Sequence, residues 1–286
     1  MSTPNLADAV RVLDGFYPSD TAAGWDRVGL VTGDLEQPVR LVRFAVDPTL
    51  AVIEEARDAG ADLLVTHHPL LLRGVHSVAT STAKGAAVTT LVVADIALYC
   101  AHTNADVATP GVNDALAAAC GLPTDAEPLG FEDGQPLGKV GDLPEAVTLG
   151  AYAAMLAEAL PAAPAGLRVS GDPEATVRRV AVQGGAGDTR FDAVRRSGAD
   201  VYVTADLRHH PALEAREEAR GGAPYLIDAG HWATEWLWLA GCADRFRQTL
   251  HAQGYDVDTA VSQLRTDPWD FVVSTGCPVR TEPKEQ

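Results

Sequence analysis

Residues 39–69, VRLVRFAVDPTLAVIEEARDAGADLLVTHHP, decide the fold class. The stretch VRLVRFAVDPT predicts a buried strand, LAVIEEARDAGA predicts a helix closed by Gly60, and DLLVTHHP predicts a second strand. A strand, a helix and a strand in this order indicate a parallel sheet covered by helices. Ligands of such sheets bind beyond the carboxyl ends of the strands, where His67 and His68 stand in this sequence.

A second stretch, residues 177–211, repeats this pattern. It contains VRRVAVQGGAGD, a helical segment and GADVYVTADLRHHP, and both stretches end with Gly-Ala-Asp, then Val-Thr, then His-His-Pro. Two copies at so long a spacing do not make a solenoid. We therefore predict an α/β protein built from two related α/β lobes.

The best domain boundary lies in residues 121–145, which are punctuated by Pro, Gly and acidic residues. We expect the first lobe to be discontinuous, with residues 1–125 and 230–286, and the second lobe to comprise residues 126–229.

Composition excludes several function classes. The 286 residues carry a formal net charge of −17 and no cluster of Lys and Arg, which argues against nucleic-acid binding. No apolar stretch approaches the roughly 20 residues of a spanning helix, and the N-terminus lacks the pattern of a signal peptide. We expect a cytoplasmic protein without a membrane partner. Its scattered cysteines favour reduced, buried thiols; they are Cys100, Cys120, Cys242 and Cys277.

His67 and His68 follow the predicted strand DLLVT and precede Pro69. Adjacent residues of a straight strand point to opposite faces, but the chain can turn at a strand end, so both imidazoles could reach one cavity. For an isolated His-His-Pro, an ordinary pair of loop histidines is as good an explanation.

The segment AHTNAD places His102 and Asp106 just after another predicted buried strand, IALYC. This is again a carboxyl edge, although Asn and Asp also favour capped turns. In DAGHWATEW, His231 and Glu235 are four residues apart at the start of a predicted helix and share one of its faces. Gly230 permits close approach of the backbone. A solvent-facing pair usually explains such spacing, but three polar clusters at corresponding ends of elements favour a site.

Together these clusters supply three imidazoles and two carboxylates, which is about enough for two divalent ions if a carboxylate bridges them. The composition suits zinc, iron or manganese and does not select among them. The candidate metal ligands are His67, His68, Asp106, His231 and Glu235.

Other features are less specific. GGAGD at 184–188 could cradle a phosphate, but it lacks the GxGxxG pattern and a P-loop Lys, so a tight turn explains it equally well. His210 is either at a cavity rim or an ordinary surface histidine, and a packed indole accounts for Trp25. Core or subunit contacts, rather than base stacking, are expected for Trp232, Trp236 and Trp238.

At these motifs the chain resembles the Nif-three-like dinuclear metal-centre family, whose bacterial members are often labelled GTP cyclohydrolase I type 2 homologues. The resemblance covers nearly the whole chain. Its matching stretches are GWDRVGLVTGD (24–34), DLLVTHHPL (62–70), IALYCAHTNADVATPGVNDALA (96–117), ADVYVTADLRHHPAL (199–213) and LIDAGHWATEW (226–236).

The resemblance implies two α/β lobes flanking a metal-containing cleft, in a short form without the inserted domain of some members, and assembly into a toroidal homohexamer. It implies the five metal ligands named above, with His102 as a near neighbour of the ions. His210 matches the family's histidine of the second lobe. The sequence departs from the family at Ala105, where Leu is usual, and at His209, where an aromatic residue is usual.

By this resemblance we expect a hydrolase with two divalent metal ions, in which metal-activated water attacks the ring of a purine nucleotide. His102 or His210 would move the proton. The rival interpretations are a non-catalytic metal-binding or regulatory scaffold, and a hydrolase of another phosphate ester or amide.

Overall fold

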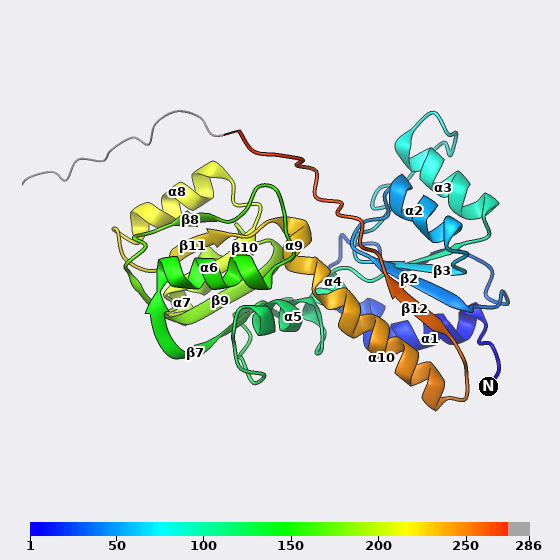
Figure 1. Cartoon of the computed structure of the whole chain (residues 1–286), viewed down its shortest axis with the longest axis horizontal. Coiled ribbons are helices and arrows are strands. Elements are labelled where there is room, and N and C mark those ends of the chain that lie inside the picture. Colours follow the sequence, from blue (N-terminus) through cyan, green and yellow to red (C-terminus); the bar gives the residue numbers. More distant parts are fainter. Residues whose placement is uncertain (274–286) are drawn as a thin grey trace, which may run out of the picture.

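The chain folds into two α/β lobes that lie side by side (Figure 1). The computed structural model describes residues 1–273. The α/β class and the two-lobe arrangement predicted from the sequence are confirmed. The strand–helix–strand units of the two predicted repeats are β2–α2–β3 in the first lobe and β9–α7–β10 in the second, and in each unit the two strands are parallel.

The first lobe is built on a five-stranded sheet of order β1-β4-β3-β2-β12, in which only β1 is antiparallel to its neighbour. Its strands are β1 (Gly29–Thr32), β2 (Leu41–Ala45), β3 (Leu63–Thr66), β4 (Ala97–Cys100) and β12 (Asp258–Val261). Its helices are α1 (Leu6–Phe16), α2 (Leu50–Asp58), α3 (Ala83–Val93) and α10 (Trp238–Ala252).

Alternation along the strands divides the core of the first lobe into two layers. Phe44 and Val65 face α1 and α10, where they pack with Phe246. Leu64, on the opposite face, packs with Ile53 and the other apolar residues of α2 and α3. Because both faces are covered, β3 and β4 are buried along their whole length, and only the strand ends can open into a site.

The second lobe holds a five-stranded sheet of order β7-β9-β10-β11-β8, with parallel β9, β10 and β11 between antiparallel edges. Its strands are β7 (Lys139–Thr148), β8 (Arg168–Ser170), β9 (Thr176–Ala186), β10 (Val201–Ala205) and β11 (Tyr225–Asp228). The helices around it are α5 (Val112–Ala119), α6 (Leu149–Ala159), α7 (Phe191–Ser197) and α8 (His209–Glu218), and a hairpin is formed by β5 (Gly130–Glu132) and β6 (Gln135–Leu137).

Two short helices lead the chain from one lobe to the other, α4 (Thr103–Val107) and α9 (His231–Trp236). The 3-10 helix η1 (Ser19–Thr21) follows α1 within the first lobe and packs near α4. Figure 1 shows α9 at the junction, with α10 continuing from it across the first lobe. The single helix predicted after Gly230 is therefore two helices that meet at Leu237.

The domain boundary at 125/126 remains a prediction. Leu116 and Cys120, which precede it in the chain, pack in the core of the second lobe. Cys100 and Cys242 are also buried free thiols, whereas Cys277 lies outside the described residues. In residues 1–273 no helix combines the length and the apolar character needed to cross a membrane.

An ion pair inside the first lobe gives a test of this packing. Glu55 on α2 accepts hydrogen bonds from Arg43 of β2 at 2.5 Å and from the Ser262 hydroxyl after β12 at 2.6 Å. Burial raises the pKa of Glu55, but these two donors outweigh it and hold the pKa below its ordinary value. These contacts join helix α2 to strand β2 and to the segment that follows β12.

We expect Glu55→Gln to lower the free energy of unfolding at pH 7 by about 1 kcal/mol, the net worth of such hydrogen bonds. A lowered folded-state pKa stabilises the fold above the unfolded pKa, near 4.5, and this contribution disappears as the pH falls through the folded pKa. Urea titrations of the wild type and Glu55→Gln at pH 7 and pH 3 measure the free energy of unfolding of each, and the difference between the two proteins should be smaller at pH 3. The exposed neighbour Glu54→Gln is the control, and equal losses for the two variants at pH 7 would contradict the expectation.

Candidate metal centre

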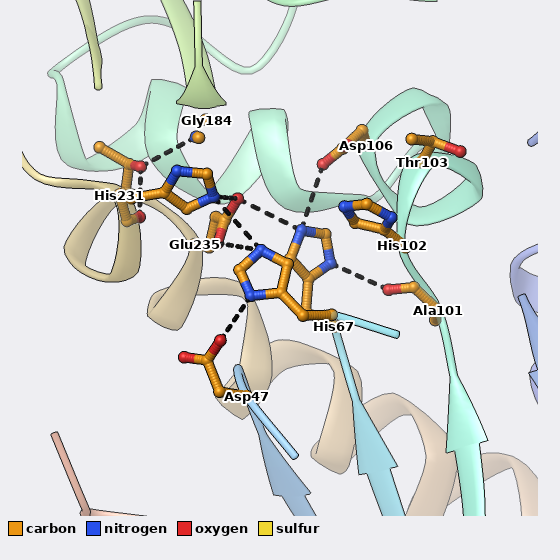
Figure 2. A network of polar contacts seen from close by, with 12 residues as sticks. Asp47, His67, Ala101, His102, Thr103, Asp106, Gly184, His231 and Glu235 are labelled. Atoms are coloured by element: carbon orange, nitrogen blue, oxygen red, sulfur yellow. Dashed lines mark hydrogen bonds and ion pairs between the residues drawn. The ribbon is translucent and has the colours of Figure 1, made fainter. Parts of the chain in front are cut away.

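The polar residues that the sequence placed at strand ends gather where the two lobes face each other (Figure 2). The elements that carry them come from both halves of the chain. His67 and His68 follow β3, His102 and Asp106 lie at α4 after β4, and His231 and Glu235 lie on α9 after β11.

The turn at the end of β3 brings two adjacent imidazoles to one side. The backbone N–H groups of His67 and His68 still donate to β2 and the residue after it, at 3.1 and 2.9 Å. The Thr66 hydroxyl then donates to the carbonyl oxygen of His68 at 3.0 Å and closes a turn. As a result the two ring centroids are only 5.0 Å apart.

The carboxylate of Glu235 lies at the centre of the cluster. Its Oε1 is 3.0 Å from Nε2 of His231 and 3.4 Å from Nε2 of His67. Its Oε2 is 3.1 Å from Nε2 of His68. Asp106 completes the set, with Oδ1 3.6 Å from Nε2 of His67. The five residues predicted as ligands thus lie together.

Each imidazole of the cluster is held through Nδ1, which leaves Nε2 free to face the other members. The contacts are His67 with the carbonyl oxygen of Ala101 at 2.9 Å, His68 with Asp47 at 2.7 Å, His102 with Asp26 at 3.0 Å and His231 with Asp206 at 2.8 Å. Metal-binding histidines are held in this way, because the partner of the second nitrogen fixes the tautomer and the ring orientation.

The sequence analysis missed Asp47 and Asp206 as members of this site. Both follow strands of the predicted repeats, two residues after β2 and directly after β10. Asp206 stands two residues after Thr204, as His68 stands two after Thr66 in the first repeat. This shared strand-end position was the signal that could have revealed Asp206.

Charges inside the cluster are balanced against burial. Burial raises the pKa of Glu235, but the imidazoles of His67 and His68 hold it well below its ordinary value. Burial lowers the pKa of His68, yet Glu235 raises it to about 10. For His231, Asp206 and Glu235 likewise outweigh burial and raise the pKa to about 11. The carboxylate therefore needs positive charge around it, which either protons or metal ions supply.

The donor set fits metal ions because several of its atoms lack other partners. Nε2 of His67, Oδ1 of Asp106 and Oε2 of Glu235 are buried and make no well-formed hydrogen bond to the described residues. Buried polar atoms without hydrogen bonds are costly, and metal ligation is one way to satisfy them. Nitrogen donors with carboxylates suit zinc, iron or manganese better than magnesium.

Two groups of side chains could each hold an ion, since the candidate ligand atoms of each group lie within 4.8 Å of one another. They are His67 with His68 and His102, and His68 with His231 and Glu235. The first group adds His102, expected only as a neighbour of the ions, to the residues able to bind one.

The glycines of GGAGD bring the second lobe close to the cluster. Gly185 has a φ of +63°, and a Cβ there would stand 2.5 Å from Oε1 of Glu235. The N–H groups of Gly184 and Gly185 donate to side chains of Asn113 and Thr234 at 2.9 and 3.0 Å. These two N–H groups are thus engaged within the protein, which favours the tight-turn interpretation over a phosphate cradle.

His210 is the one predicted site residue that lies apart from the cluster. It is exposed in the first turn of α8, with its ring against that of His209 at 5.1 Å between centroids. Neither residue lines the two cavities beside the cluster. The predicted role of His210 in proton transfer stays a prediction.

Two cavities reach the cluster from different sides. One, of about 630 Å³, is lined by His68, Asp206 and the segment 266–272. The other, of about 480 Å³, is lined by His102, Asp106 and Glu235. A small molecule could approach the cluster through either of them.

Fold and site together define a two-lobed α/β protein whose facing strand ends carry histidine and carboxylate groups that could bind metal ions. Residues 4–268 match the model of the family described as Duf34/NIF3 (NGG1p interacting factor 3). The chain belongs to this family, which confirms the resemblance seen in its motifs.

A relative from Streptomyces coelicolor, named GTP cyclohydrolase 1 type 2 homolog, is 50% identical over 95% of this chain and 96% of its own length. A relative of the same name from Mycobacterium leprae is 35% identical over 374 aligned residues, covering 93% of this chain and 95% of its own. That alignment exceeds the 286 residues of this chain, as expected for a short form.

The fold is also that of a solved structure, the Bacillus cereus protein related to NIF3. The TM-score is 0.86 at 27% identity, and the match covers 95% of this chain and 100% of the other.

The anchoring carboxylates give a test of the site. We expect Asp47→Asn to weaken the binding of zinc about ten- to hundredfold, because a neutral amide replaces the ionised carboxylate that accepts a hydrogen bond from Nδ1 of His68 and orients its ring. Competition with a chromophoric chelator measures the change. Asp267→Asn is the matched control, since Asp267 lines the larger cavity, as Asp47 does, and among the described residues its side chain accepts a hydrogen bond from the backbone N–H of Trp269 but from no imidazole. Wild-type affinity in Asp47→Asn would contradict the expectation.

Proposed function

We propose that this chain is a hydrolase that depends on two divalent metal ions. The single observation that carries the proposal is the convergence of buried ligand atoms of His67, Asp106 and Glu235 beside anchored imidazoles, where they make no well-formed hydrogen bond to the described residues. The proposed ligands are His67, His68, Asp106, His231 and Glu235, and the proposed metals are zinc, iron or manganese.

Glu235 is the proposed bridge between the two ions. Its Oε1 lies between the imidazoles of His231, at 3.0 Å, and His67, at 3.4 Å, and its Oε2 is 3.1 Å from Nε2 of His68. His67 and Asp106 lie together on the side nearer α4, and His231 lies on the other. A carboxylate with a donor group on each side suits a shared ligand.

Bound divalent ions would lower the pKa of a water molecule and stabilise negative charge that develops on a substrate. The protein groups around them have separate tasks. Glu235 and the ring of His67 are buried, and Asp26 holds Nδ1 of His102, which lines the smaller cavity beside Asp106. We propose His102 as the group that carries the proton to the leaving atom.

The proposed substrate is a purine nucleotide, in which one water opens the ring to leave a formamide and a second water hydrolyses the formamide to an amine and formate. Support comes from the name GTP cyclohydrolase 1 type 2 homolog, carried by relatives up to 50% identical. The cavity of about 480 Å³ beside the cluster has the size of a site for such a ring. Assembly into a homohexamer remains a prediction from the family resemblance.

Formate release tests this function. Protein loaded with zinc, iron(II) or manganese should release formate from GTP. His67→Ala removes one of the proposed metal ligands and should reduce the rate to the uncatalysed background, because the ring of His67 hydrogen-bonds only to Ala101 and otherwise faces the cluster among the described residues. His251→Ala, an exposed histidine at the end of α10, is the control and should retain the rate.

Formate release by His67→Ala at the wild-type rate would contradict the proposed site. Metal binding without any formate release would instead refute the reaction and favour a non-catalytic metal-binding protein.

A further inference from the structure

The smaller cavity contains features that the metal ligands do not use. Three parts of the chain surround it, namely residues 20–25, the β5–β6 hairpin and the end of β9, and its inner wall includes His102 and Glu235. Its volume of about 480 Å³ is within the range of cavities that hold small molecules. Both lobes contribute to it.

The wall of this cavity includes a buried amide whose oxygen lacks a hydrogen bond. Gln183 of β9 is 7% exposed, and its Oε1 is buried with no hydrogen-bond partner among the described residues. Its Nε2 donates to the carbonyl oxygen of Gly184 at 3.2 Å. If the amide were turned by 180°, its Oε1 would face the carbonyl oxygen of Gly184, which is unfavourable. The atom without a partner is therefore Oε1, a hydrogen-bond acceptor.

The backbone at Gln183 is irregular, and the irregularity brings it to the site. The register of β9 against β10 shifts between Val203 and Ala205, where β9 carries two additional residues. Such bulges redirect side chains and recur beside functional sites. Here the bulge places Gln183 in the cavity wall and Gly185 against Glu235. Leaving an amide oxygen unpaired is unfavourable unless a ligand supplies the donor.

An exposed aromatic side chain, Trp25, lines this cavity. Trp25 is 59% exposed, and its ring meets that of His102 edge-on, with centroids 5.9 Å apart and an interplanar angle of 76°. The N–H of Ala23 donates to the Thr103 hydroxyl at 2.9 Å and fixes the segment to α4. An exposed indole held in place offers a face on which a flat ring can stack.

Other groups of the wall are acceptors as well. Glu132 and Asp133 of the hairpin line the cavity, and the one arginine there, Arg190, is already paired with Glu132 at 2.9 Å. In the larger cavity, Arg168 is paired with Asp228. The smaller cavity therefore suits a ligand that brings N–H donors.

We propose that the smaller cavity is the ring-binding subsite of this protein. A flat nitrogen heterocycle with N–H donors stacks on Trp25 and presents its opposite edge to the metal cluster, and the Gln183 side chain turns toward the cavity so that its Oε1 accepts a hydrogen bond from the ring. The proposal deepens the hydrolase function and rests on it for the identity of the ring, but ring binding itself requires no turnover.

The test is calorimetric titration of the full chain with guanosine, both as purified and after zinc loading. Gln183→Leu should weaken binding about tenfold, the effect of one neutral hydrogen bond, and Trp25→Ala by about tenfold or more through lost stacking. The matched controls are Trp269→Ala and Gln263→Leu, an exposed indole of the larger cavity and an exposed amide, which should bind guanosine as the wild type does. D-Ribose should not bind measurably.

Guanosine binding by Gln183→Leu and Trp25→Ala at wild-type affinity would overturn the proposal, as would an equal loss in Trp269→Ala. Absence of saturable guanosine binding, with and without zinc, would overturn it too. Circular dichroism of each variant shows whether it is folded, and each substitution tests the subsite separately. Ring binding without formate release would refute the reaction but leave the subsite intact, whereas formate release without these losses would refute the subsite alone.

Discussion

The buried carboxylate of Glu235, with imidazole nitrogens on both of its oxygens, is the interaction on which the junction of the two lobes depends. Only 3% of Glu235 is exposed, and a buried charge is unfavourable unless opposite charge and hydrogen bonds surround it. Its partners His67 and His68 come from the first lobe. The second lobe supplies Gly185, whose missing Cβ leaves room for the carboxylate. Neither lobe alone could hold this group.

Parallel strands explain how residues far apart in the chain meet with such order. The carboxyl ends of β3 and β4 face those of β9 and β10. The ends of β3 and β4 carry proposed metal ligands, the end of β10 carries Asp206, which holds the ring of His231, and the end of β9 carries Gly185, whose backbone lies close to Glu235. Hydrogen bonds through Nδ1 then fix the rings before any ion binds. Orientation of this kind reduces the cost of bringing donors together, which suits a site built for ions.

Periodicity and strand-end logic were enough to predict both lobes and the gathering of the five proposed ligands. Those features follow from local patterns, such as the four-residue spacing of His231 and Glu235. Asp47 and Gln183 could not be found in this way, because Asp47 takes its role from a partner 21 residues away and Gln183 from a bulge that appears only when β9 pairs with β10. His210 carried the same His-His-Pro motif as His68, yet four additional residues after Thr204 place it on the exposed start of α8.

The most direct test of the central claim is the metal content of the purified chain. Inductively coupled plasma mass spectrometry of the wild type, saturated with zinc and freed of excess, should give two ions per chain, and Glu235→Ala should hold at most one because the proposed bridge is lost. Equal metal content in the wild type and Glu235→Ala would contradict the account, and so would a wild-type chain that retains only trace metal.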